Sequence, residues 1–229
     1  MRRYLLLRNP GHNRVYYLES EKLALAELTL TSKRFDQPCD HIESINIAGI
    51  NYLSFTVGQI LSETELKWLS NLSFVLALYQ QSADTTDSAL HPVELTPHSH
   101  VDPKISMLLK YSGKTNEIFT RMMVNVGLVS SDFGLDDAIQ LLDPVSGKGT
   151  TLFEGAIRGF DVTGIESERK MVHEATIFFK KFLEQEKYKH SLSKHAMYSS
   201  STGSEASIQL FEYARDKQEF KTESSRKHL

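Results

Sequence analysis

Apolar and polar positions in the first 80 residues repeat with the spacing of short strands and helices. Glu65 follows Ser62 by three positions ahead of an apolar run, a spacing typical of a capped helix start. The elements expected here are strands over residues 4–7, 45–57 with a turn at Gly49, and 74–79, and helices over residues 19–28 and from Ser62 onward. This pattern predicts a small α/β region over residues 1–80.

A polar stretch over residues 81–103 interrupts this pattern and holds three of the six prolines, so we expect a linker there. Residues 104–229 then return to regular spacing. The elements expected in this second region are helices over residues 104–111, 116–126, 151–158 and 167–186, strands over 139–142 and 162–165, and a serine-rich loop over 190–210. Strands alternating with helices predict an α/β fold with a parallel sheet.

Composition narrows the class of protein only slightly. The sequence is 40% hydrophobic and 24% charged, values that are ordinary for a globular protein, and it has no apolar run near the roughly 18 residues of a membrane span. Cys39 is the single cysteine, so an intrachain disulfide is excluded and we expect a cytoplasmic protein. The net charge of −3 gives no general attraction to nucleic acid. Basic residues outnumber acidic ones only in residues 168–229. They could form a stripe that binds phosphates, or they could simply lie on a solvated helix face.

The segment from Leu141 to Glu166 carries the clearest chemical pattern. One predicted strand ends at Asp143, a turn with Gly147 and Gly149 leads into a helix, and a second strand ends at Glu166. Glycine lets the backbone approach a ligand closely, and in nucleoside-binding βαβ units the second acid binds the ribose hydroxyls. The two glycines could instead serve only a tight turn between strand and helix.

The same turn also resembles a phosphate-binding loop, the main alternative. A Walker A loop would need glycine at the position of Leu142 and a hydroxyl residue at that of Gly149, and neither is present. Asp143 would also repel a polyphosphate, whereas S-adenosylmethionine has no phosphate and carries a sulfonium and an ammonium group. The paired acids therefore favour S-adenosylmethionine as the cofactor over a nucleotide in a P-loop-like protein.

Two stretches resemble known enzymes. D-P-x-x-G-x-G-T at residues 143–150, followed by G-x-D-x-x-G-x-E at 159–166, resembles the cofactor motif of the THUMP-associated RNA methylase superfamily, in particular its tRNA guanine exocyclic-amine methyltransferases. K-Y-S-G-K-T-N-E-I-F-T at residues 110–120 is similar to a segment that precedes their catalytic domain. The likeness is clearest over residues 104–186 and implies a Rossmann-like methyltransferase domain that acts on RNA. It also implies an RNA-binding role for the N-terminal region, residues 1–80.

The resemblance also implies roles for individual residues. Those expected at the methionine part of the cofactor are Asp143, Pro144, Gly147, Gly149 and Thr150, with Asn116, Phe119 and Thr120 nearby and Glu166 at the ribose. Asn116 and Thr120 could equally be a helix cap or a core-facing polar residue. No metal is expected.

The sequence departs from the family in one respect, because it lacks the [DN]-P-P-[YFW] motif that aligns the target amine with the methyl group. It has no proline after Pro144, and the catalytic residues stay unassigned. Either the domain is incomplete and a C-terminal segment or a second chain completes the sheet, or the chain is a catalytically inactive cofactor-binding or RNA-binding module. We expect an incomplete domain.

Overall fold

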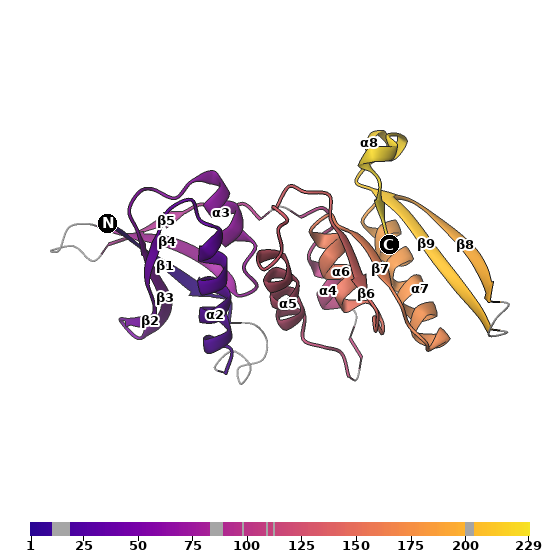
Figure 1. The fold of residues 1–229 in the computed structure, drawn as a ribbon, viewed down its shortest axis with the longest axis horizontal. Helices are drawn as coiled ribbons and strands as arrows, with labels where there is room; N and C mark the ends of the chain where they lie inside the picture. The colour runs from indigo at the N-terminus through magenta and orange to yellow at the C-terminus, as the bar shows by residue number, and fades with distance from the viewer. Residues whose placement is uncertain (11–18, 83–88, 98, 109, 112, 200–203) are drawn as a thin grey trace. The chain divides into compact units, whose positions relative to one another are not determined.

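The computed structural model describes residues 1–10, 19–82, 89–97, 99–108, 110–111, 113–199 and 204–229. The chain forms two compact units (Figure 1). Unit 1 contains Met1–His98 and Arg121–Asp137, and unit 2 contains Ser99–Thr120 and Ala138–Leu229. Among the helices in the described ranges, none is both long and apolar enough to cross a membrane.

Unit 1 is built on an antiparallel sheet with the strand order β2-β3-β1-β4-β5. The strands are β1 (Arg2–Arg8), β2 (Cys39–Ile47), β3 (Ile50–Val57), β4 (Val75–Gln81) and β5 (Leu90–Val93). Alternate strand positions such as Tyr4, Leu6 and Phe55 are buried against Leu28 of helix α2 and Leu69 of helix α3. These helices span Glu21–Thr31 and Glu63–Ser70, and the capping box expected at Ser62 and Glu65 is present.

A buried carboxylate ties the helices of unit 1 together. Glu27 of α2 accepts hydrogen bonds from the Ser73 amide at 3.1 Å, the Ser73 hydroxyl at 2.6 Å and the side-chain amide of Asn125 at 2.5 Å. Asn125 lies on helix α5 (Glu117–Val129). The short 3-10 helix η1 (Ser32–Arg34) contributes Arg34, which donates to the backbone carbonyls of Leu128 and Val129 and so satisfies groups left open at the end of α5.

Unit 2 begins with helix α4 (Lys104–Leu108) and contains the βαβ segment expected from the sequence. Strands β6 (Gln140–Asp143) and β7 (Asp161–Gly164) are parallel, and helix α6 (Thr150–Ile157) connects them. Helix α7 (Arg169–Gln185) follows. Phe153 of α6 and Phe179 of α7 stack with ring centroids 5.8 Å apart, which joins the two helices in one core.

The prediction of a serine-rich loop over residues 190–210 is wrong. Residues 190–199 and 204–210 lie in two antiparallel strands, β8 (Lys189–Ser199) and β9 (Ser204–Ala214), and residues 200–203 are outside the described ranges. Strand β10 (Lys227–His228) pairs with β9 on its other side, and β8 and β9 are called the hairpin below. Helix α8 (Lys217–Lys221) and the 3-10 helix η2 (Glu223–Ser225) precede β10. Phe211 and Tyr213 of β9 are buried and pack edge-on against Phe179, so the apolar face of α7 fixes the hairpin as a sheet.

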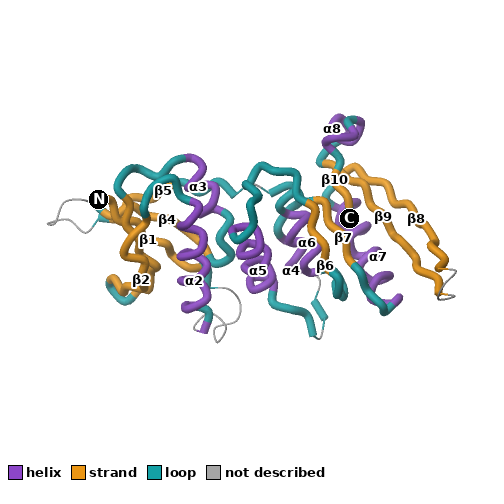
Figure 2. The backbone as a smooth tube through the Cα atoms, in the orientation of Figure 1, coloured by secondary structure: helices purple, strands orange, loops and turns teal. Residues whose placement is uncertain are grey.

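The mixed α/β fold is confirmed, but the extended parallel sheet is not. Among the described residues, the largest sheet is the antiparallel one of unit 1, and only β6 and β7 pair in parallel. Figure 2 marks the strands of each unit in orange. The residues expected as a linker, 81–103, include β5, which pairs with β4. Residues 121–137 also group with unit 1, whereas the sequence placed them in the second region.

Helix α6 lies so close to the parallel strands that one helical glycine has no room for a side chain. A Cβ atom on Gly155 would lie 2.6 Å from Val162 Cγ1 and 2.9 Å from Leu141 Cδ2. A Cβ atom on Gly127, within α5, would have nothing within 4 Å.

We therefore expect Gly155→Ala to lower the free energy of unfolding by about 1–3 kcal/mol, because the added methyl group overpacks the contact between helix and sheet. Gly127→Ala is the matched control and should raise stability by up to about 1 kcal/mol through helix propensity alone. Urea unfolding of both variants is the measurement. Equal stabilisation by the two substitutions would contradict the packing described here.

Candidate functional site

Asp143 and Glu166, the two acids singled out in the sequence, lie at the same edge of the parallel strands. Asp143 ends β6 and pairs in register with Gly164, two residues before Glu166. The Ile165 amide donates to the carbonyl of Asp143 at 2.9 Å, and the Ser146 amide donates to the carbonyl of Ile165 at 3.0 Å. The loop after β6 is therefore bonded to the end of β7, which brings both carboxylates to one side of the sheet.

The loop from Pro144 to Gly149 needs its two glycines for their backbone conformation. Gly147 has φ 54° and Gly149 has φ 86°, both in the left-handed region that disfavours other residues. Gly149 is the N-cap of α6, and Asp143 Oδ1 accepts a hydrogen bond from the Val145 amide at 3.0 Å. Asp143 thus starts the turn as an Asx residue, and the exposed Pro144 follows it.

A third glycine, which the sequence analysis did not assign to the site, is needed for the loop to approach β7. A Cβ atom on Gly164 would lie 2.6 Å from Leu152 Cδ1 and 2.7 Å from Ser146 Oγ. The available signal was its position two residues before the acid Glu166, within the quoted motif.

The carboxylate of Glu166 is the point at which the loop closes. Its Oε2 accepts from the Gly147 amide at 2.9 Å, and its Oε1 accepts from the Glu168 amide at 2.7 Å and the Ser167 hydroxyl at 3.3 Å. These bonds, led by that of the Glu168 amide, lower the pKa of Glu166. A carboxylate offers about four acceptor positions, so bonds within the chain already occupy most of those of Glu166.

The side chain of Lys148 reaches helix α7. Its Nζ atom lies 2.5 Å from Glu174 Oε2 and 4.6 Å from the centre of the Tyr111 ring. The Tyr111 hydroxyl in turn lies 3.4 Å from the Thr150 hydroxyl at the start of α6. The segment around Tyr111 and the glycine loop, quoted separately in the sequence, therefore lie together, although Ser112 is outside the described residues.

Asn116, Phe119 and Thr120 form a helix start. Asn116 Oδ1 accepts from the amides of Ile118 at 2.9 Å and Phe119 at 3.1 Å, and the buried Thr120 hydroxyl donates to the Asn116 carbonyl at 3.1 Å. Asn116 is thus the cap that the sequence left open as an alternative. In the part of unit 2 that the structure describes, the hydrogen bonds of Asn116 and Thr120 serve the helix.

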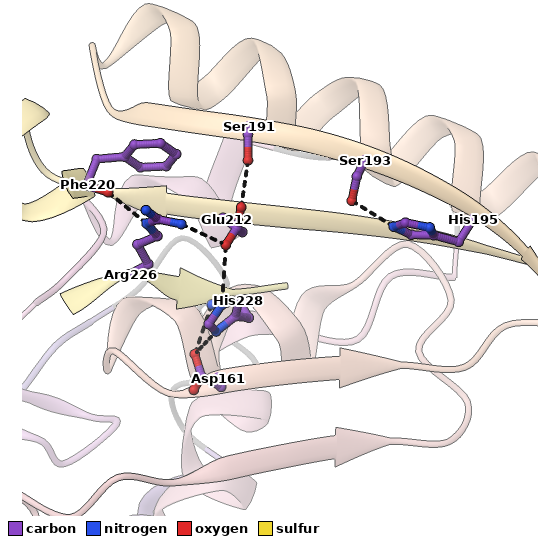
Figure 3. A network of polar contacts seen from close by, with 8 residues as sticks. All are labelled: Asp161, Ser191, Ser193, His195, Glu212, Phe220, Arg226 and His228. Atoms are coloured by element: carbon purple, nitrogen blue, oxygen red, sulfur yellow. Dashed lines mark hydrogen bonds and ion pairs between the residues drawn. The ribbon is translucent and has the colours of Figure 1, made fainter. Parts of the chain in front are cut away.

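A second polar cluster lies at the opposite end of β7 and stabilises the hairpin (Figure 3). Asp161 Oδ1 accepts from the His228 amide at 2.8 Å and lies 3.1 Å from His228 Nδ1. Glu212 lies 3.2 Å from Arg226 and 3.1 Å from the Ser191 hydroxyl. Since Arg226 pairs with Glu212, part of the basic charge of residues 168–229 is used within the fold.

No family model matches this sequence, and no curated protein matches it either. The resemblance of residues 110–120 and 143–166 to the RNA methylases accordingly stays a prediction.

Because its folded-state pKa is lowered, Glu166 contributes stability that is fully present above its ordinary pKa of about 4.5 and is lost as the pH falls through the lowered value. The difference in unfolding free energy between the wild type and Glu166→Gln should therefore be constant from about pH 7 to 5 and shrink below about pH 4.5. Urea unfolding across this range measures it. A difference that grows on acidification would contradict the hydrogen-bonding pattern of Glu166.

Proposed function

We propose that unit 2 is the cofactor-binding part of an S-adenosylmethionine-dependent methyltransferase that acts on RNA, with an exocyclic amine of a tRNA guanine as the target. The observation that supports this cofactor is that Asp143 and Glu166 follow the adjacent ends of β6 and β7, with the Gly147 amide of the connecting loop bonded to Glu166. The RNA target rests on the resemblance of residues 110–120 and 143–166.

The charge of this edge supports a cationic ligand. The carboxylates of Asp143 and Glu166 border a turn whose backbone can approach a ligand, and both would attract the sulfonium and ammonium groups of the cofactor. A polyphosphate would meet the same two charges as repulsion. The P-loop-like alternative is supported less well for this reason.

The bound cofactor would supply an electrophilic methyl group for direct displacement by the target amine. Glu166 would accept a hydrogen bond from the ribose, and Gly147 and Gly149 would let the backbone approach the methionine part. Pro144 and Thr150 border that position at the two ends of the loop. The contribution of these residues is binding and orientation, and no residue of the chain is assigned to the chemical step.

We propose further that β6–α6–β7 belongs to a Rossmann-like parallel sheet, to which a second chain adds strands. A catalytically inactive cofactor-binding or RNA-binding module is the second candidate, favoured by the missing [DN]-P-P-[YFW] motif. The single cysteine is the basis for placing the protein in the cytoplasm.

Glu166→Ala should weaken S-adenosylmethionine binding about 5- to 150-fold, because the lost ribose hydrogen bonds amount to about 1–3 kcal/mol. Isothermal titration of the full chain is the measurement. Glu168→Ala is the matched control, since this exposed acid is two residues away and contributes its backbone amide to the site. An unchanged dissociation constant for Glu166→Ala would remove Glu166 from the site.

Gly147→Leu should abolish binding, because the side chain would occupy the space through which the backbone approaches the cofactor and would be strained at φ 54°. Gly49→Leu is the matched control for strain, at φ 85° in the β2–β3 turn of unit 1. It should leave the affinity unchanged in the same titration. Retained affinity in Gly147→Leu would show that the cofactor binds elsewhere.

A further inference from the structure

Lys148 is the one basic residue between Asp143 and Thr150, and it stands between the two glycines of the turn. In phosphate-binding loops, a lysine just before the helix reaches the phosphate groups of the ligand. The side chain of Lys148 does not lie free for such a contact. It is 18% exposed, and its ammonium group is held by Glu174 at 2.5 Å and faces the Tyr111 ring.

Glu174 comes from a separate element, since it lies on α7 and its carboxylate reaches back to the turn. The ion pair with Lys148 is the main cause of a lowered pKa for Glu174. Glu174 is therefore ionised when the cofactor would bind, and it neutralises Lys148. The remaining charges of the turn are the carboxylates of Asp143 and Glu166.

We infer that the Lys148–Glu174 ion pair sets the charge preference of the turn, so that the turn binds a cationic nucleoside and rejects a nucleotide that carries phosphates. Glu174 is a specificity-determining residue that acts through Lys148. This inference rests on the proposed function, because it assigns the selectivity of the same site.

The charges of Lys148 and Glu174 should affect the binding of a cationic nucleoside and of a diphosphate in opposite directions. Removing the charge of Glu174 releases Lys148 from its ion pair, so that its ammonium group can approach a ligand at the turn. It also lowers the negative charge of the site by one unit. Both changes weaken the attraction for a sulfonium and strengthen it for a diphosphate. Removing Lys148 instead leaves Glu174 without its partner and adds one negative charge, which has the reverse effect.

The test is isothermal titration of the full chain with S-adenosylmethionine and with ADP. Glu174→Gln should weaken S-adenosylmethionine binding about two- to fivefold and strengthen ADP binding about fivefold, the size expected for one partly exposed charge contact. Glu184→Gln is the matched control, because it breaks the Lys180–Glu184 pair of the same helix at 3.8 Å, almost three turns from Glu174. It should change neither affinity.

Two further variants keep the test independent of folding defects. Lys148→Gln should strengthen S-adenosylmethionine binding about two- to fivefold and weaken ADP binding. The double variant Lys148→Gln with Glu174→Gln should lose the gain in ADP affinity seen with Glu174→Gln alone, because the released ammonium group is absent.

The outcomes separate the two proposals. If the wild type binds S-adenosylmethionine but Glu174→Gln and Lys148→Gln leave the ratio of the two affinities unchanged, the inference is overturned and the proposed function stands. If the wild type binds ADP and not S-adenosylmethionine, or binds neither, the proposed function is overturned and the inference falls with it.

Discussion

The hydrogen bond between the Gly147 amide and the Glu166 carboxylate is the contact on which the arrangement of unit 2 depends. It joins the turn after β6 to the residues after β7, so that the segments that follow the two strands lie together. The amides of Ser146 and Ile165 add two backbone bonds beside it. Together these bonds hold the segments that carry Asp143 and Glu166 side by side.

Close packing of helix and strand makes this contact possible. Gly155 and Gly164 leave no space for a side chain, which lets α6 lie against β6 and β7 and lets the turn reach the end of β7. The aromatic core around Phe179 then fixes α7, and α7 carries the carboxylate that holds Lys148. The core of unit 2 therefore determines both the shape of the turn and the charge that it presents.

The local elements of unit 2 could be predicted from sequence because their signals are local. Asp143, Gly147, Gly149 and Glu166 mark strand ends and a turn by their own chemistry, and Asn116 is a typical cap. The hairpin was missed because its serines resemble a loop, and only burial of Phe211 and Tyr213 against α7 makes it a sheet.

The Lys148–Glu174 pair could not be predicted for a related reason. The two residues are far apart in sequence, and their contact depends on how α7 packs beside α6. The same limit applies to the extent of the parallel sheet. The strand pattern of residues 139–165 predicts two parallel strands, and the pairing of any further strand depends on the tertiary structure.

We propose that one turn, closed on Glu166, binds a cationic nucleoside. Amide chemical shifts recorded while S-adenosylmethionine is added to the full chain test this claim most directly. We expect the amides of Gly147, Gly149 and Glu166 to shift in a saturable way, and ADP to leave them in place. Saturable shifts that leave these three amides unchanged and fall in unit 1 would contradict the account.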